Sequence, residues 1–468
     1  MSLYTTLDRH CLLPLSEKLF GRDISTAYRE SLRTEWLGRE ALDALQRERL
    51  QRLVRHCYEH VPYYRRLFDR LHLSPAEVQT PDDLAKLPVL TKDQVRQHYD
   101  ELIADDAATR HYLHGSTGGS TGTPLRFLHD VQTWNRLRAA GLRMWHTAGF
   151  ELGERMFTLA GNSLVKHTKR RLPKAKDLYD RYIMRNLKRN CTDLSPEALA
   201  GHYRAMMAYH PKAIRGYASS LYFLARYIEQ HQLPVPEVKA VFTTGEKLHP
   251  AYRHKLQQVF RVPVFDAYGA ADGGVAAYEC PLHTGMHLSE ENCIVEIVAP
   301  DGRPLPDGET GHVLTTDLNN YVFPFLRYQV GDLAYIDPTP CSCGRASRRL
   351  GEVIGREGRA IYNKQGRPFS SVVIDNMMFP QLDYHSTANQ LLYERMERFQ
   401  VQQDEQGDIH ILIKPVDEAE SVHTFDYIRH NFTTFFPDSK VTLSLVRDIP
   451  PLPSGKEDYC LSLYHPNL

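Results

Sequence analysis

The feature that most constrains the fold is an alternation of short apolar runs and longer helical stretches that begins near residue 156. The apolar runs are MFTLA, KAIRGY, KAVFTTGE and VPVFDAYG, and a representative helical stretch is SSLYFLARYIEQ. A strand, a glycine-containing turn and a helix, repeated, are typical of an α/β sheet with buried parallel strands. The sequence therefore predicts an α/β fold for the middle of the chain.

The segments before and after this alternation have other patterns. Residues 40–67 carry apolar side chains at three- to five-residue intervals, which predicts a helix that ends before Pro62. A second helix is expected after Thr91. Residues 287–336 contain the apolar runs CIVEIV, GHVLTTDL and DLAYI, and these predict antiparallel strands and hairpins.

The last part of the chain has a strand and helix pattern of its own. The run IHILIKP predicts a strand, HTFDYIRHNF a helix, and KVTLSLV another strand. This segment has about the size of a small domain. We expect a large α/β domain with a helical beginning and a β-rich part over residues 1–354, a boundary at residues 355–358, and a small α+β domain over residues 359–468.

Charge and composition exclude several classes of protein. The 468 residues include 57 Lys and Arg and 57 Asp and Glu, a balance that argues against a dedicated nucleic-acid binder. No apolar run approaches the roughly 18 residues of a membrane span, and the start MSLYTTLDRHCLLPL lacks the basic region of a signal peptide. We therefore expect a cytoplasmic protein whose eight cysteines are reduced thiols or metal ligands.

The most informative motif is the glycine-rich segment HGSTGGSTGTPLRF at residues 114–127. Its glycines allow backbone conformations that are closed to other residues, and its Ser and Thr side chains add hydroxyl donors. Such a loop can surround a polyphosphate with N–H and O–H groups. It is not a Walker A loop, because the Gly-Lys-Ser/Thr sequence is absent. Taken alone, it is also compatible with a flexible linker.

Four further motifs follow the glycine-rich segment in a fixed order. They are VFTTGEKLHP, VFDAYGAADGG, FPFLRYQVGDLAYI and PPLPSGKEDY. In this order the motifs resemble the adenylate-forming superfamily of acyl-CoA synthetases, luciferases and adenylation domains. The segments RERLQRLVRHCYEHVPYYRRLFD and LPVLTKDQVR resemble the phenylacetate–coenzyme A ligase branch, and STGGSTGTP is similar to its capsule-biosynthesis (CapK-type) relatives.

The resemblance implies a set of nucleotide-binding residues in this sequence. Tyr268 would lie beside the adenine, Asp332 would accept hydrogen bonds from the ribose, and Asp272 would hold Mg²⁺. Thr121, Asp272 and Lys456 are the catalytic residues that it implies. The nucleotide-binding residues are Ser116, Thr117, Gly118, Gly119, Ser120, Thr121, Gly122, Thr123, Gly245, Glu246, Asp266, Tyr268, Gly269, Asp332 and Arg356.

Lys456, in the Ser-Gly-Lys sequence, would act in the chemical step. When a carboxylate attacks the α-phosphorus of ATP, charge builds on the phosphoryl and bridging oxygens, and a cation placed there stabilises the transition state. Three positions depart from the family pattern. Thr123 replaces a lysine and Asp272 replaces a glutamate. The sequence GREGR falls where the family has its hinge, so the resemblance implies a hinge at residues 355–358, in which Gly358 replaces the hinge aspartate.

A second group of residues predicts a zinc site. Cys280, His283 and His287 lie close together in the sequence, and the Cys-x-Cys pair of residues 341 and 343 follows about fifty residues later. Zinc prefers thiolate and imidazole ligands in a tetrahedral arrangement. We expect a structural site made by Cys280, His287, Cys341 and Cys343, with His283 as the alternative histidine. The other interpretation is a set of ordinary buried thiols.

The resemblance implies an AMP-forming ligase that activates a small carboxylic acid with ATP and Mg²⁺ and then transfers the acyl group to coenzyme A. Two other functions stay open. The acyl group could pass to an amine or a carrier protein, or the chain could be a nucleotide-binding protein that has lost catalysis. A homodimer is also left open, and no nucleic-acid or membrane partner is expected.

Two features bear on the substrates. The basic stretch VKHTKRRLPKAK at residues 165–176 is either a solvated loop or a docking surface for the phosphates of coenzyme A. Residues 160–163, 216–220 and 267–274 are candidate walls for the acid, and Tyr217 would suit an aromatic or flat acid.

Overall fold

In the computed structural model of the chain, the four apolar runs from residue 156 onward are strands, as predicted. They are β3 (Met156–Ala160), β5 (Ala213–Gly216), β6 (Ala240–Thr244) and β7 (Val264–Ala270). Neighbouring strands in this set pair in parallel, and most of their residues are buried. Burial on both faces explains why their sequences are nearly continuous apolar runs.

The structure describes most of the chain, in two units. The large unit is Met1–Val330 with Ala334–Glu352, and the small unit is Gly331–Leu333 with Val353–Leu468. No helix in the described part is long and apolar enough to cross a membrane. The residues described are 3–7, 11–116, 125–161, 178–191, 193–356, 361–364, 368–369, 374, 377–378, 395–450 and 459–464.

The strands of the large unit continue into one mixed sheet. Its order among the described residues is β10-β11-β12-β13-β9-β8-β7-β6-β5-β3-β4. The sequence predicted the antiparallel strands β10 and β11 but not their place in the same sheet as the parallel strands. The remaining strands are β4 (Asn186–Asn190), β8 (Val275–Glu279), β9 (Met286–Leu288), β10 (Cys293–Val298), β11 (Gly311–Asp317), β12 (Tyr328–Asp337) and β13 (Arg349–Arg356).

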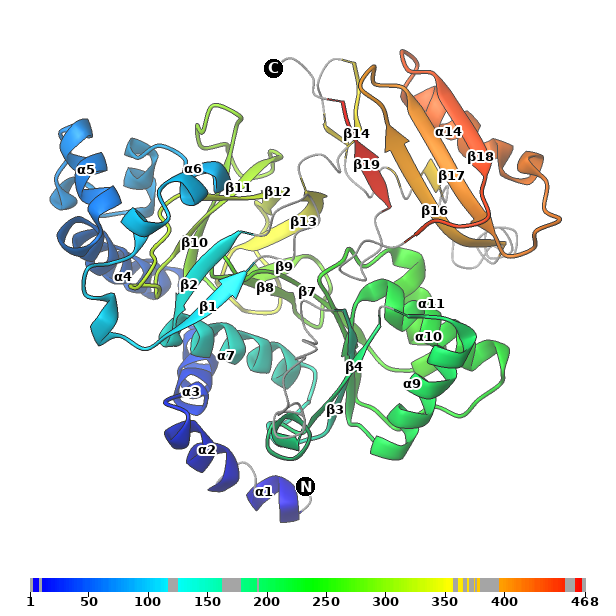
Figure 1. Cartoon of the computed structure of the whole chain (residues 1–468), viewed down its shortest axis with the longest axis horizontal. Coiled ribbons are helices and arrows are strands. Elements are labelled where there is room, and N and C mark those ends of the chain that lie inside the picture. The colour runs from blue at the N-terminus through cyan, green and yellow to red at the C-terminus, as the bar shows by residue number, and fades with distance from the viewer. Residues whose placement is uncertain are drawn as a thin grey trace. The chain divides into compact units, whose positions relative to one another are not determined.

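Helices cover both faces of the parallel strands. Figure 1 shows α9, α10 and α11 together on one face, with α7 on the opposite side. Trp145 of α7 packs against Phe242 of β6, with ring centroids 6.2 Å apart, in a core cluster that also includes α3. The helices are α7 (Val131–Thr147), α9 (Pro196–Tyr209), α10 (Ala218–Gln230) and α11 (Pro250–Phe260), with a π-helical turn at Tyr179–Ile183.

The helical beginning of the chain agrees with the sequence prediction. The first predicted helix ends at His60, and a new helix starts at Pro62, where a proline is tolerated because its missing N–H would have no helical partner. The helix expected after Thr91 begins there with a reciprocal capping box between Thr91 and Gln94. These helices are α1 (Leu3–Leu7), α2 (Leu13–Leu19), α3 (Ile24–Thr34), α4 (Arg39–His60), α5 (Pro62–Leu71) and α6 (Lys92–Gln97).

A hairpin and several short turns also belong to the large unit. An antiparallel hairpin of β1 (Tyr112–Ser116) and β2 (Arg126–Asp130) follows short 3₁₀ turns at Pro75–Glu77, Pro81–Lys86, Asp100–Leu102 and Ala107–Thr109.

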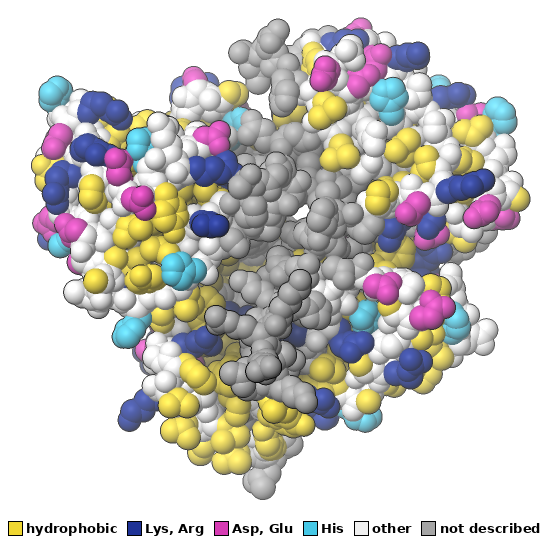
Figure 2. Space-filling view, viewed as in Figure 1, with side chains coloured by type: hydrophobic (Ala, Val, Ile, Leu, Met, Phe, Trp, Pro, Cys, Tyr) yellow, Lys and Arg dark blue, Asp and Glu magenta, His cyan; other side chains and the backbone are white. Residues whose placement is uncertain are grey.

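Several large apolar side chains of α1 and α2 are exposed, among them Leu7, Leu15 and Leu19. Figure 2 shows hydrophobic side chains gathered over the end of the large unit that carries these helices.

The small unit is an α+β fold, as predicted. Its larger sheet has the order β18-β17-β16-β19, and the helix α14 packs over it through Ile428 and Phe432, which share a core with Ile411 and Ile413 of β17. The elements are β14 (Ile361–Tyr362), β15 (Pro368–Phe369), β16 (Met396–Gln403), β17 (Ile409–Pro415), a 3₁₀ turn at Val422–Phe425, α14 (Asp426–Phe435), β18 (Val441–Leu445) and β19 (Cys460–Ser462).

Candidate functional site

The candidate nucleotide site begins at the carboxyl ends of β6 and β7, where open α/β sheets bind ligands. The turn after β6 requires Gly245, which has a φ of +80°, a conformation that side chains with a Cβ rarely adopt. The next residue, Glu246, accepts a hydrogen bond of 2.9 Å from the backbone N–H of Ser219 in the first turn of α10. This bond fixes the carboxylate at a helix N-terminus, where negative charge is stabilised.

The end of β7 and the turn that joins it to β8 carry the residues expected beside the adenine and the metal. Tyr268 and Gly269 pair with Ala277 and Ala276 of β8, and both are accessible to solvent. Asp272 is half-buried in the turn and accepts a hydrogen bond of 2.8 Å from the hydroxyl of Tyr328 on β12. One carboxylate oxygen of Asp272 is thus held in place by a neighbouring strand.

Close packing fixes the position of this turn. Gly274 has a φ of +67°, and a Cβ there would collide with the carboxyl group of Asp317 at the end of β11. Burial raises the pKa of Asp317 to about 7, and Asn319 donates a hydrogen bond of 3.0 Å to it. The turn therefore lies directly on the sheet, with a partly protonated carboxyl group beneath it.

The hairpin of β1 and β2 brings the glycine-rich segment to the same turn. Ser116 and Arg126 are partners in its register, so the two ends of the segment are held side by side. His129 of β2 lies beside the backbone of Ala271, next to Asp272, and burial lowers the pKa of this histidine to about 4. The base of the hairpin thus lies next to the turn, with a neutral imidazole between them.

Several expected nucleotide-binding residues lie outside the described residues, and their positions stay predictions. For Ser116 the structure gives the backbone in β1, and for Arg356 the backbone at the end of β13. The residues outside the description are Thr117, Gly118, Gly119, Ser120, Thr121, Gly122, Thr123, Gly358 and Lys456.

Asp266 and Asp332 are both described, in different settings. Asp266 is buried inside β7, where Thr243 donates a hydrogen bond of 2.5 Å to it, and its own backbone N–H donates to Glu279. Burial, with the charge of Glu279 next, raises the pKa of Asp266 to about 7. The carboxyl group therefore contacts protein groups in the interior. Asp332 is half-buried in β12 and follows Gly331, whose φ is +89°.

The four residues expected to bind zinc come together in the large unit. The possible ligand atoms of Cys280, His287, Cys341 and Cys343 all lie within 4.8 Å of one another. The sulfur atoms of Cys280 and Cys341 are 3.7 Å apart, and the sulfur of Cys343 is 3.3 Å from Nε2 of His287. His283 points elsewhere, because its Nδ1 lies 2.9 Å from Glu279. The structure thus favours His287 over His283 as the histidine of this group.

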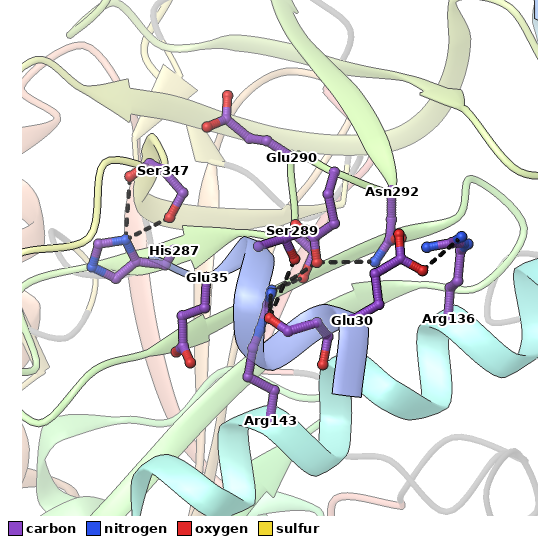
Figure 3. A network of polar contacts seen from close by, with 12 residues as sticks. Glu30, Glu35, Arg136, Arg143, His287, Ser289, Glu290, Asn292 and Ser347 are labelled. Carbon is purple, nitrogen blue, oxygen red and sulfur yellow. Dashed lines mark hydrogen bonds and ion pairs between the residues drawn. The ribbon is translucent and has the colours of Figure 1, made fainter. Parts of the chain in front are cut away.

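The environment of His287 suits a metal ligand. Its Nδ1 lies 3.0 Å from the hydroxyl and 3.2 Å from the backbone oxygen of Ser347, as Figure 3 shows. An N–H bond to Ser347 leaves the lone pair on Nε2, which faces Cys343. Burial lowers the pKa of His287 to about 4, so the imidazole is neutral at physiological pH. Three thiols and one imidazole form a donor set that fits zinc.

A buried ionic network supports the segment that follows His287. Arg143 of α7 donates hydrogen bonds of 2.8 Å to Glu291 and 3.0 Å to Ser289, and Figure 3 shows it reaching toward this segment. Glu290 in the same segment binds Arg348 at 2.8 Å, near the start of β13. The pair of Glu290 and Arg348 joins the segment after His287 to the segment after Cys343, and Arg143 fixes the first of these segments to α7.

Three contacts in the site were not predicted from the sequence. Tyr328 lies 56 residues from Asp272, and no spacing rule joins them. His129 lies only six residues beyond Thr123, yet its contact with Ala271 depends on the fold. Ser347 follows the Cys-x-Cys pair closely, and a polar side chain at that place was the only available signal.

Comparisons with known proteins place the chain in a family. No family model matches it. It is 30% identical over 341 residues to the phenylacetate-coenzyme A ligase of Thermus thermophilus, which covers 69% of this chain and 72% of that protein. The chain belongs to the phenylacetate–coenzyme A ligase family. The match to the phenylacetate-coenzyme A ligase of Escherichia coli is 28% over 329 residues, 68% of this chain and 71% of that protein.

The ligase family and the class of enzyme agree with the resemblance seen in the motifs. As a member of this family, the chain is an AMP-forming acid–coenzyme A ligase. It is also similar to Protein CapK of Staphylococcus aureus, with 19% identity over 423 residues that cover 89% of this chain and 88% of that protein.

Solved structures confirm the fold of this ligase. A 2-hydroxyisobutyryl-CoA ligase in the postadenylation state matches with a TM-score of 0.71 and 19% identity, over 92% of this chain and 91% of that chain. The anthranilate CoA ligase AuaEII in complex with anthranoyl-AMP matches with a TM-score of 0.56 and 14% identity, over 88% of this chain and 79% of that chain. At these identities the likeness shows a shared fold.

Proposed function

We propose that the protein activates a small carboxylic acid with ATP, releases pyrophosphate, and transfers the acyl group to the thiol of coenzyme A. Family membership supports the general reaction. The observation that carries the proposal for this chain is the contact of His129 with Ala271, which brings the base of the glycine-rich hairpin to the turn with Asp272. The glycine-rich segment can then bind the phosphates of ATP while the carboxylate of Asp272 binds the Mg²⁺ of the same nucleotide.

In the first half-reaction, a carboxylate oxygen of the acid attacks the α-phosphorus of ATP. The new O–P bond forms as the bond from the α-phosphorus to the bridging oxygen breaks, and pyrophosphate leaves. Thr121 and the other residues of the glycine-rich segment surround the phosphates, and Lys456 stabilises the charge on the phosphoryl oxygens. Tyr268 lies beside the adenine and Asp332 binds the ribose.

Mg²⁺ fits the carboxylate of Asp272. This group is half-buried and oriented by the hydroxyl of Tyr328, as a ligand for a hard cation needs to be. When bound, Mg²⁺ neutralises charge on the phosphates. The role of the protein is to hold the carboxylate: Tyr328 fixes one oxygen, and the packing of Gly274 on Asp317 fixes the turn.

In the second half-reaction, the thiol of coenzyme A attacks the acyl carbon, and AMP leaves with the electron pair of the broken C–O bond. The two half-reactions need different groups at the acyl carbon. We propose that residues 359–468 form a domain that rotates on a hinge at residues 355–358 between them. Lys456 serves the first half-reaction and then moves away.

Zinc in the cluster of Cys280, His287, Cys341 and Cys343 completes the proposal. With four protein ligands no position remains open, so the site is structural. It links the end of β8 and the strand β9 to the loop between β12 and β13. The metal stabilises the framework of the large unit and takes no part in the reaction.

An exchange assay tests the proposed reaction. ATP–pyrophosphate exchange is measured against a broad library of aromatic and aliphatic acids, and the product with each active acid is identified by mass spectrometry. Coenzyme A, amines and a carrier protein are supplied separately, and the thioester of coenzyme A is expected. An amide or an acylated carrier would instead identify another acceptor. Tight ATP binding without turnover of any acid would favour an inactive nucleotide-binding protein.

The substrate class and the assembly state belong to the same proposal. We propose an aromatic or otherwise flat acid, although Tyr217, expected at the wall of its pocket, is fully buried. The acid library decides this point, because an exclusive preference for branched aliphatic acids would contradict it. Light scattering of the purified protein tests for a homodimer.

A further inference from the structure

A second cluster of metal-ligating side chains lies in the large unit, and the proposed reaction does not use it. It consists of His56 and His60 near the end of α4 and Asp106 at the start of a 3₁₀ turn. One nitrogen of each histidine and one oxygen of the aspartate all lie within 4.8 Å of one another. Two residues four positions apart share one face of a helix, so both imidazoles point to the same side.

Hydrogen bonds determine which nitrogen of each histidine is available. Nε2 of His56 donates to the backbone oxygen of Tyr321 at 2.8 Å, because a carbonyl oxygen can only accept. Nδ1 of His60 donates in the same way to the carboxylate of Asp105, also at 2.8 Å. In a neutral imidazole the other nitrogen then carries the lone pair. Histidines that bind metals are usually oriented by such bonds to a carbonyl or a carboxylate.

Asp106 supplies a carboxylate oxygen that is held in place and has no hydrogen-bond partner among the described residues. One oxygen, Oδ2, accepts two hydrogen bonds from Arg110, at 3.0 and 2.8 Å. The other oxygen, Oδ1, is buried and has no hydrogen-bond partner among the described residues. A buried carboxylate oxygen without a partner is unfavourable, and a bound cation would satisfy it.

The backbone around the cluster is also fixed before any ion binds. The N–H of Asp105 donates to the carbonyl of His60 at 2.8 Å, and the N–H of Ala104 donates to Val322 at 3.0 Å. The rings of His56 and His60 lie 4.9 Å apart. The three ligands thus come from two segments that are bonded directly to each other, so an ion would not need to order the site.

The charges around the cluster permit a cation. His56 and His60 line a cavity of about 610 Å³, which gives an ion a path from solvent. The cavity also contains the arginines Arg49, Arg52, Arg55, Arg110 and Arg136. Four of them form ion pairs: Arg49 and Arg136 with Glu30, Arg52 with Glu48, and Arg110 with Asp106. Figure 3 shows the pair of Arg136 and Glu30.

We propose that His56, His60 and Asp106 form a second metal site, which binds a divalent transition metal such as Zn²⁺ or Co²⁺. Two imidazoles and one carboxylate are ligands that these ions accept, and they differ from the thiolates of the cysteine cluster. Three protein ligands leave positions open toward the cavity, where water or an oxyanion drawn by the arginines completes the coordination. The site is independent of the proposed ligase reaction.

Titration of the full-length protein with Co²⁺, after the cysteine cluster has been filled with one equivalent of zinc, tests the proposal. We expect one further equivalent to bind by calorimetry. It should give visible d–d absorption without a new thiolate charge-transfer band, because no sulfur is among the ligands. A charge-transfer band, or no second equivalent, would overturn the proposal.

Matched variants locate the ion. Loss of an outer partner of a metal ligand usually weakens metal binding 10- to 100-fold. His60→Ala and Asp106→Asn each remove a proposed ligand, so each should weaken binding of the second equivalent by more than this. Asp105→Ala, which removes such an outer partner, should weaken it by about 10- to 100-fold. His98→Ala is the control, since His98 also bonds to a carboxylate at 2.8 Å but lies outside the cluster. Wild-type affinity in both His60→Ala and Asp106→Asn would contradict the assignment.

Discussion

The two sites that the sequence predicted differ in where their residues lie in the chain. The cysteine and histidine cluster lies entirely within the large unit, and its four residues are described together. The residues that we propose for the nucleotide come from both units of the chain: Asp272 and Tyr328 belong to the large unit, Asp332 is grouped with the small unit, and Lys456 lies in the sequence of the small unit. A structural site can be completed by one unit, whereas a two-step reaction benefits from groups that can separate. The variants below test this contrast, from the largest expected effect to the smallest.

Loss of the cluster should destabilise the fold. Cys341→Ser removes one of four ligands, and we expect loss of bound zinc with a decrease in the free energy of unfolding of about 4 kcal/mol, in the range typical of lost metals. Metal analysis and urea unfolding measure both effects. Cys11→Ser, at an exposed cysteine, is the control and should retain metal and stability. Unchanged zinc content in Cys341→Ser would show that Cys341 is not a ligand.

Loss of Lys456 should act on chemistry alone. Lys456→Ala should lower the rate of ATP–pyrophosphate exchange by about 10²–10³, or roughly 2.7–4 kcal/mol of transition-state stabilisation. The melting temperature and the affinity for ATP should stay close to those of the wild type. Lys440→Ala, at an exposed lysine of the small unit, is the control. Full exchange activity in Lys456→Ala would contradict the role assigned to this lysine.

The pH dependence of stability tests the packing under the turn with Asp272. The pKa of Asp317 is raised from 3.8 to about 7 by burial, so the folded state holds this proton more tightly than the unfolded state. The stability that it contributes is therefore present at low pH and is lost as the pH rises from about 4 through 7. Relative to the wild type, Asp317→Asn should gain about 2 kcal/mol between pH 5 and 7.5.

Urea unfolding of both proteins at the two pH values measures this difference. Asp301→Asn is the control, because Asp301 is exposed and should change the pH dependence little. Parallel stability curves for Asp317→Asn and the wild type would show that Asp317 is ionised in the folded protein, and the turn would then rest on a charged group.

The smallest effect is expected for the hydroxyl that orients Asp272. Tyr328→Phe removes a hydrogen bond to a proposed metal ligand, and we expect about a tenfold increase in the Mg²⁺ concentration needed for half-maximal exchange. Tyr335→Phe removes a hydroxyl from the same strand and should have no such effect. A lower maximal rate without a change in Mg²⁺ dependence would show that Tyr328 acts through the fold instead.

Local patterns in the sequence were enough to predict most elements and the residues of the cysteine and histidine cluster. The strands β5, β6 and β7 follow from their apolar runs, and Pro62 and Thr91 set helix boundaries. Cys280, His287 and the Cys-x-Cys pair were found because zinc accepts few side-chain types. The choice between His283 and His287 needed the structure, because Glu279 binds His283.

Contacts between distant residues could not be predicted in the same way. Periodicity identifies strands but not their neighbours, so the union of parallel and antiparallel strands in one sheet was missed. The hydrogen bond of Tyr328 with Asp272 and the contact of His129 with Ala271 depend on that union. The histidine pair of α4 was visible in the sequence, but its third ligand, Asp106, lies 46 residues after His60, and only the fold joins them.

Isotope transfer tests the central claim most directly. An active acid labelled with ¹⁸O in its carboxyl group is incubated with ATP, Mg²⁺ and coenzyme A, and the nucleotide products are analysed by mass spectrometry. If the carboxylate attacks the α-phosphorus, AMP carries one ¹⁸O atom and pyrophosphate carries none. Formation of ADP, with ¹⁸O in inorganic phosphate, would show attack at the γ-phosphorus and would contradict the account.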